Sequence, residues 1–97
     1  MQFVIHAYDK PDSLNIRLEN RPAHVAYVTG PGSGLMVAGP MLAEDGETPI
    51  GTMLVVEAES KAAATAFAEG DPYAKAGLFA EVRIDNIKIT VNNATPA

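Results

Sequence analysis

Apolar, β-rich segments alternate with helical segments along this chain, in an order that few folds accommodate. Four segments rich in β-branched and aromatic residues predict strands, and they span residues 2–8, 35–42, 51–58 and 79–91. Helical patterns begin at Leu14 and after Ser60. The third strand is expected to run antiparallel to the second. The order β-α-β-β-α-β predicts an α+β, ferredoxin-like fold in which an antiparallel sheet carries both helices on one face.

The first strand and the first helix have recognisable boundaries. Residues 2–8 are almost continuously apolar, which predicts a central strand buried on both faces. Asp12 or Ser13 is placed to cap the following helix, and the run Gly30–Gly34 ends it. Pro22 predicts a kink or a restart, because proline lacks the backbone donor and collides with the preceding turn. The apolar residues of this helix fall near one stripe, formed by Leu14, Leu18, Val25 and Val28.

The second half of the chain begins with an edge signal. Pro40 marks a strand end, an edge or a bulge, because proline cannot donate to a strand ladder. An alanine-rich helix capped by Ser60 is expected to run to about Glu69, with Gly70 as its left-handed terminator and Phe67 as its large anchor.

The last elements are short. Residues 71–73, Asp-Pro-Tyr, are typical of the cap and first position of one further turn, which Gly77 closes. In the last strand the alternation slips at residues 85–86, which predicts a bulge. Residues 92–97 are small and polar and are expected to fray.

Length and composition exclude several classes of protein. With 97 residues, 47% hydrophobic and 20% charged, the chain fits a single globular domain over residues 1–97. A net charge of −5 disfavours nucleic acid and anionic membrane surfaces as partners. The chain has no cysteine and two histidines, so we expect no metal site. No apolar run reaches the ~20 residues that cross a bilayer, and we expect a soluble cytoplasmic protein.

One face of the predicted sheet has no helix to cover it. Its strands are apolar enough that a second copy of the chain is the simplest cover. We therefore expect a homodimer, built sheet to sheet or strand to strand, and higher assembly stays open.

His24 is the first candidate for chemistry, because an unperturbed imidazole titrates near neutral pH and suits general base work. Spacings of three and four residues place Arg17, Arg21 and His24 along one helix face, which could hold an anionic ligand. The alternative is an ordinary surface histidine on a solvated helix.

Asp71 is the second candidate. A carboxylate can fix the tautomer of a histidine and stabilise the imidazolium that forms on proton abstraction. The alternative is purely structural, since aspartate before proline is a good helix N-cap. The two roles are compatible, because a carboxylate has several acceptor positions. His6, Tyr8 and Tyr73 are further candidates for contact with a small hydroxylated ligand, or else for core packing.

Several short motifs, taken in order, resemble the YciI-like (YCII) family of dimeric ferredoxin-like α/β barrels. They are Asp9-Lys10-Pro11, Arg17, Arg21-Pro22-Ala23-His24, Ala38-Gly39-Pro40, Ser60, Asp71-Pro72-Tyr73 and Gly77-Leu78. The resemblance covers nearly the whole chain. It implies a His–Asp pair at the active site, carried here by His24 and Asp71, and it adds Gly39 and Pro40 to the expected substrate-binding residues.

The resemblance also implies a reaction. Where activity is established in the family, the pair starts a proton transfer that eliminates halide from a chlorinated hydroxyquinol. We expect a small cofactor-free enzyme of this lyase type, acting on a quinol-like or quinone-like molecule. The alternatives are a non-catalytic module that binds a small metabolite, and an isomerase or monooxygenase of the related barrels. Oxygen uptake would separate a monooxygenase from elimination, which consumes none.

Overall fold

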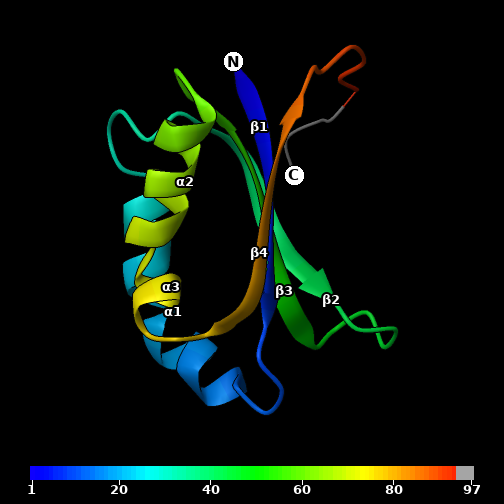
Figure 1. Cartoon of the computed structure of the whole chain (residues 1–97). Helices are drawn as coiled ribbons and strands as arrows, with labels where there is room; N and C mark the ends of the chain where they lie inside the picture. Colours follow the sequence, from blue (N-terminus) through cyan, green and yellow to red (C-terminus); the bar gives the residue numbers. More distant parts are fainter. Residues whose placement is uncertain (94–97) are drawn as a thin grey trace.

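The computed structural model describes residues 1–93, and the order β-α-β-β-α-β is confirmed (Figure 1). The expectation that the chain end frays falls largely on residues 94–97, which lie outside the described residues. The elements are β1 (Gln2–Asp9), α1 (Leu14–Val28), β2 (Leu35–Leu42), β3 (Pro49–Glu57), α2 (Lys61–Gly70), α3 (Pro72–Lys75) and β4 (Phe79–Ile87).

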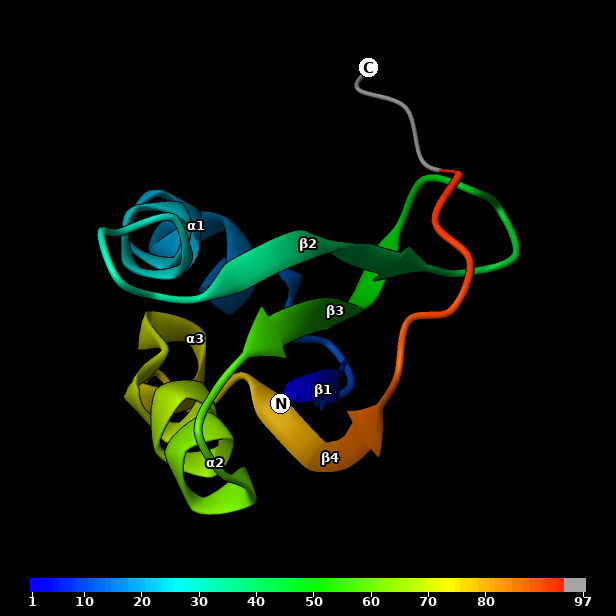
Figure 2. The ribbon, with the colours of Figure 1, turned by 90° about the horizontal axis from the view of Figure 1, so that it is seen from above.

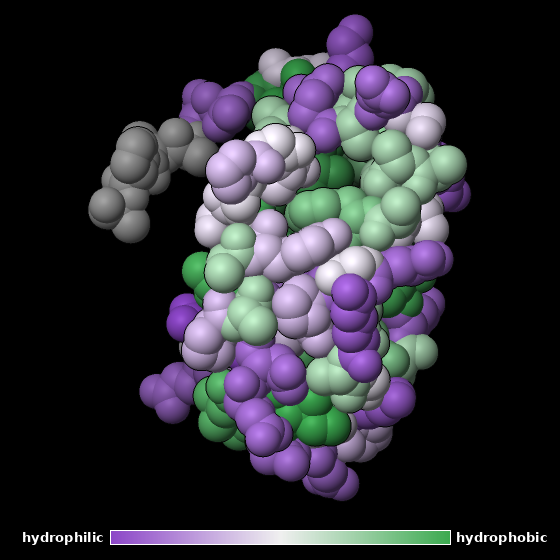
Figure 3. All heavy atoms as spheres, turned by 90° about the vertical axis from the view of Figure 1, so that its left-hand side faces the viewer, coloured by the Kyte–Doolittle hydropathy of each residue, from purple (hydrophilic) through white to green (hydrophobic). Residues whose placement is uncertain are grey.

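The strands form one antiparallel sheet in the order β2-β3-β1-β4. Strand β1 therefore lies inside the sheet and β2 lies at an edge, where Pro40 is tolerated as predicted. The described helices all lie on one face of the sheet, with α1 alongside β2 and with α2 nearer β4 (Figures 1 and 2). The side that the helices form mixes hydrophilic and hydrophobic residues, as expected of a layer that faces solvent (Figure 3).

The core lies between the sheet and the helices. Phe3 and Ile5 of β1 pair directly with Val56 and Leu54 of β3, and all four side chains are buried on this face. Each such side chain contributes about 1.5–3 kcal/mol when it leaves water. The prediction that β1 is buried on both faces is wrong for the single chain, because its alternate residues, such as Val4, are only partly buried.

Helix α1 is one continuous helix with Pro22 inside it, so the predicted restart does not occur. Most of its predicted apolar stripe does not face the sheet, since Leu14, Leu18 and Val25 are 45%, 61% and 39% exposed. Of the stripe only Val28 is buried, together with Arg17 and His24. Their spacings of seven and four residues define a face about one position away from the leucines. Arg17 and His24 therefore lie on the buried face of α1, where a helix in a small domain usually places apolar residues.

The remaining turns follow the predictions in part. The Ser60 hydroxyl accepts from the Ala63 amide and caps α2, and Gly77, at φ 75°, ends the turn after α3. Gly70 is not the predicted left-handed terminator, because it keeps a helical backbone as the last residue of α2. A Cβ there would lie 2.5 Å from the Tyr27 hydroxyl oxygen, so close approach rather than φ explains this glycine.

The last strand begins at Phe79 as predicted but ends at Ile87 rather than at residue 91. Its irregular register lies between Tyr8 and Asp9 of the partner strand, opposite residues 79–81. The predicted bulge at residues 85–86 is therefore wrong. Most residues of β4 are exposed on either face, so the alternation of its apolar residues does not indicate how the strand pairs.

Candidate active site

Two ionisable side chains from distant parts of the chain meet beneath α1. The Nδ1 atom of His24, on α1, lies 2.9 Å from both carboxylate oxygens of Asp71, at the start of α3. His24 is 7% exposed and Asp71 is 2% exposed. Hydrogen bonds that involve a charged group are stronger than neutral ones, and burial shields this pair from water.

Asp71 is held in place by the backbone of its own turn. Its Oδ1 accepts from the Tyr73 amide at 2.9 Å, and Pro72 occupies the first helical position. The carboxylate thus caps α3 and contacts His24 at the same time. Since an ionised carboxylate can only accept, the proton of a neutral His24 lies on Nδ1.

That tautomer leaves Nε2 of His24 with its lone pair. No hydrogen bond to Nε2 is present among residues 1–93, and no side-chain nitrogen or oxygen that is fully enclosed there lacks a partner. Nε2 is therefore not fully enclosed by these residues, and His24 lines a cavity. A histidine that is held by a buried carboxylate at one nitrogen and unbonded at the other can act chemically as a general base.

Tyr73 lies between His24 and Arg17. Its ring stacks on the imidazole with centroids 3.9 Å apart and planes at 12°, and the Arg17 guanidinium carbon lies 4.8 Å from the ring centroid. Burial raises the pKa of the Tyr73 hydroxyl, and the positive charges of Arg17 and Arg21 oppose that rise. The ring is neutral at physiological pH and fixes the plane of the imidazole.

Arg17 is anchored by residues that the sequence did not single out as site residues. Its Nε and Nη2 atoms donate to both carboxylate oxygens of Asp9 at 2.8 Å, and Nη2 also donates to the Thr52 hydroxyl at 2.9 Å. Burial alone would lower the pKa of Arg17, but the hydrogen bonds and charge of Asp9 outweigh burial and raise it. The motif Asp9-Lys10-Pro11 carried a signal for Asp9, whereas nothing in the sequence distinguished Thr52.

A cavity of about 480 Å³ lies between α1 and the sheet edge at β2. Five predicted site residues line it together with His24, namely Arg17, Arg21, Tyr73, Gly39 and Pro40. Arg21 is exposed and Arg17 is buried, so the positive charge extends from the rim to the floor.

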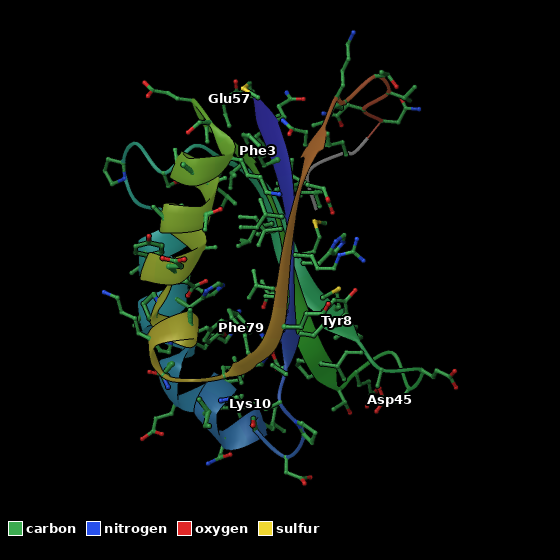
Figure 4. All side chains as sticks on the ribbon, viewed as in Figure 1. Phe3, Tyr8, Lys10, Asp45, Glu57 and Phe79 are labelled. Carbon is green, nitrogen blue, oxygen red and sulfur yellow. The ribbon has the colours of Figure 1, made fainter. Side chains whose placement is uncertain are left out.

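His6 and Tyr8 were candidates for ligand contact or for core packing, and neither lines this cavity. Residues of even number on β1 point away from the helices, whereas the buried residues Phe3, Ile5 and Ala7 point toward them. Figure 4 shows Tyr8 on the far side of the sheet, where its ring centroid lies 6.4 Å from that of His6. The cavity lies on the helix side, so neither residue lines it.

Within residues 1–93, no group of three or more His, Asp or Glu side chains gathers in a way that could hold a metal ion. None of the helices in that range has the length and apolarity to span a membrane.

Residues 1–88 match the model of the YCII-related domain family. The chain belongs to this family. The match confirms the resemblance inferred from the motifs. A curated relative, Protein YciI of Escherichia coli O6:H1, is 41% identical over 95 residues, which cover 91% of this chain and 97% of that protein.

Two solved structures extend the comparison. The 5-chloro-2-hydroxyhydroquinone dehydrochlorinase TftG of Burkholderia phenoliruptrix AC1100, in complex with 2,5-dihydroxybenzoquinone, is 38% identical with a TM-score of 0.81, covering 91% of this chain and 94% of that one. A heme-degrading protein of Mycobacterium tuberculosis, 24% identical with a TM-score of 0.55 and covering 95% of this chain and 100% of that one, shares the fold alone. The YCII chain therefore has the ferredoxin-like architecture and resembles an enzyme of this family.

Proposed function

We propose that this YCII protein is a cofactor-free lyase that removes a proton from a small hydroxylated ring and expels chloride from it. The observation that carries the proposal is the buried contact between His24 and Asp71 at the wall of the cavity, with no hydrogen bond to Nε2 from residues 1–93. The 38% identity to a dehydrochlorinase supports the choice of a chlorinated hydroxyquinol as substrate class. The alternative, a binding module without turnover, needs no such arrangement of base and carboxylate.

The proposed reaction balances without an oxidant. His24 Nε2 takes the proton of one ring hydroxyl, and Asp71 stabilises the imidazolium. The electron density of the oxyanion moves into the ring, and the imidazolium returns the proton to the carbon that carries chlorine. Loss of a second hydroxyl proton to His24 then expels chloride and leaves a quinone. The ring loses one proton and one chloride in total.

Arg17 and Arg21 supply the electrostatic part of the mechanism. Both guanidinium groups belong to residues that line the cavity, and they stabilise the negative charge that develops on the ring oxygen. Arg17 is fixed by Asp9 and Thr52, so it needs little reorganisation as the charge forms. A positioned base contributes about 10²–10⁴-fold, which suffices for a substrate as acidic as a chlorinated polyphenol.

A homodimer is part of the proposal. The sheet face opposite the helices has a partly buried apolar centre, which includes Val4 and Met53, and two copies packed through it would close a barrel. Sedimentation should give twice the mass of one chain, and Met53→Glu should shift the protein toward the monomer. A wild-type protein that sediments as a monomer at all concentrations contradicts the dimer and leaves the dyad proposal intact.

The decisive experiment compares the two histidines of the chain. His24→Gln should lower chloride release from 5-chloro-2-hydroxyhydroquinone by about 10²–10⁴-fold, because glutamine fills similar space without a base. His6→Gln removes the same side chain from the far face of the sheet and should leave the rate within about threefold. Near-normal turnover by a folded His24→Gln protein refutes the mechanism. No turnover by the wild type, with ligand-dependent stabilisation retained, supports the binding module instead.

A further inference from the structure

The cavity that contains His24 has two chemically different ends. At one end lie Arg17, Arg21, His24, Thr52 and Tyr73, whose side chains bear charge or hydrogen-bonding groups, and Leu18 lies beside Arg17 at this end. At the other end the walls are mainly aliphatic, with Val25 and Val28 from α1 and Leu35, Met36 and Val37 from β2, and the Thr29 hydroxyl there donates to the Val25 carbonyl. The polar end accounts for a hydroxylated ring, and the proposed chemistry leaves the aliphatic end unused.

We propose that the natural ligand of this site carries an aliphatic substituent on its hydroxylated ring, and that this substituent lies between α1 and β2. The inference rests on the proposed function for the position of the ring, and it adds the class of substrate: an alkyl-substituted polyphenol or quinone. A single unsubstituted ring does not need this part of the site.

Size is the first argument. The cavity holds about 480 Å³, and sites that bury drug-sized ligands span about 300–1,000 Å³. His24 and the aliphatic walls line the same cavity, so a substituent can extend from a ring bound beside His24 toward those walls.

Exposure is the second argument. Val25, Met36 and Val37 are 39%, 45% and 49% exposed although they line a cavity. An alkyl chain would remove this surface from water, and each fully buried methylene strengthens binding by about fourfold. A hollow between a helix and an edge strand admits a chain of methylenes, whereas a second protein copy would present a broad surface to it.

The test uses resorcinol and its 4-ethyl, 4-butyl and 4-hexyl derivatives, whose dihydroxylated ring stays constant while the chain grows. Dissociation constants are measured by titration calorimetry. Because the rim stays partly open, we expect affinity to rise at least about tenfold from ethyl to hexyl. Equal affinity for all four compounds overturns the inference.

Two apolar residues of the same helix provide a matched pair of variants. Val25 lines the aliphatic end of the cavity and Leu14, three turns earlier, does not line the cavity, yet both are exposed. Val25→Gln should reduce the gain in affinity from ethyl to hexyl by about threefold or more, while Leu14→Gln should leave that gain unchanged. An equal loss in both variants, or a gain that neither variant affects, places the alkyl chain elsewhere and contradicts the inference. A change of sedimenting mass in Val25→Gln alone, with an unaltered ligand series, assigns the valine to a protein contact and contradicts the inference as well.

The outcomes for the ligand and for the reaction are separable. A steep dependence on chain length without chloride release supports the two-ended site and refutes the lyase. Chloride release that requires His24, with no dependence on chain length, supports the lyase and refutes the substituent.

Discussion

Asp71→Asn tests how the carboxylate acts, because asparagine keeps the shape of the side chain and one of its two oxygens. The remaining oxygen can still accept from the Tyr73 amide, which lies 2.9 Å from Oδ1 in the wild type, so the cap of α3 survives. The amide nitrogen then takes the position of Oδ2, which lies 2.9 Å from Nδ1 of His24 in the wild type. Because two N–H groups repel at this distance, the tautomer with its proton on Nε2, in which Nδ1 accepts from the amide, is favoured. The base then has no lone pair toward the cavity.

The magnitudes follow from burial. Asp71 is 2% exposed, so loss of its charged hydrogen bond to His24 should cost about 1–3 kcal/mol in the free energy of unfolding. For a domain of this size that lowers the melting temperature by roughly 5–20 °C. Turnover should fall by a factor on the order of 10²–10⁴, as expected when a general base is held in the wrong tautomer. Asp71→Ala also removes the cap and should cost about 0.5–2 kcal/mol more.

The assay follows chloride release at a temperature well below the melting transition of each variant, and circular dichroism gives the transition itself. Asp12→Asn is the matched control, since Asp12 is exposed and asparagine tolerates its φ of 56°. That variant should keep wild-type turnover. A folded Asp71→Asn protein that loses stability but retains turnover within about threefold would show that the pair only joins α1 to α3, and the reasoning would be refuted.

Two other predictions concern the residues around the dyad. Arg17→Met should lower the free energy of unfolding, measured in urea, by about 3–5 kcal/mol, because it leaves the carboxylate of Asp9 buried without a partner. Adding Asp9→Leu should recover most of that loss. A loss of less than about 1 kcal/mol in the single variant contradicts this account of the ion pair. Because burial raises the pKa of Tyr73, its neutral hydroxyl stabilises the fold fully below the unfolded value of 10.0, and this contribution disappears as pH rises through the folded pKa. Tyr73→Phe should therefore make the fall in melting temperature between about pH 9 and pH 11 less steep, and an unchanged fall would mean that Tyr73 is not the residue that titrates.

The sequence alone determined the order of elements and the turns that depend on neighbouring residues. The Ser60 cap and the Asp-Pro start of α3 are local interactions, so their residues predict them without knowledge of the rest of the chain. The order of the family motifs also identified His24 and Asp71, although they lie 47 residues apart.

Only the tertiary structure decided which side of each element is buried. The alternation of β1 separates His6 from Phe3, but nothing local shows which set faces the helices. The leucines of α1 predicted the wrong face, because the buried side of this helix is occupied by Arg17 and His24. Burial of such polar groups is favourable only when distant partners supply hydrogen bonds, as Thr52 and Asp71 do here. Those partners come from other layers of the fold, so the orientation of the helix follows from the assembled molecule.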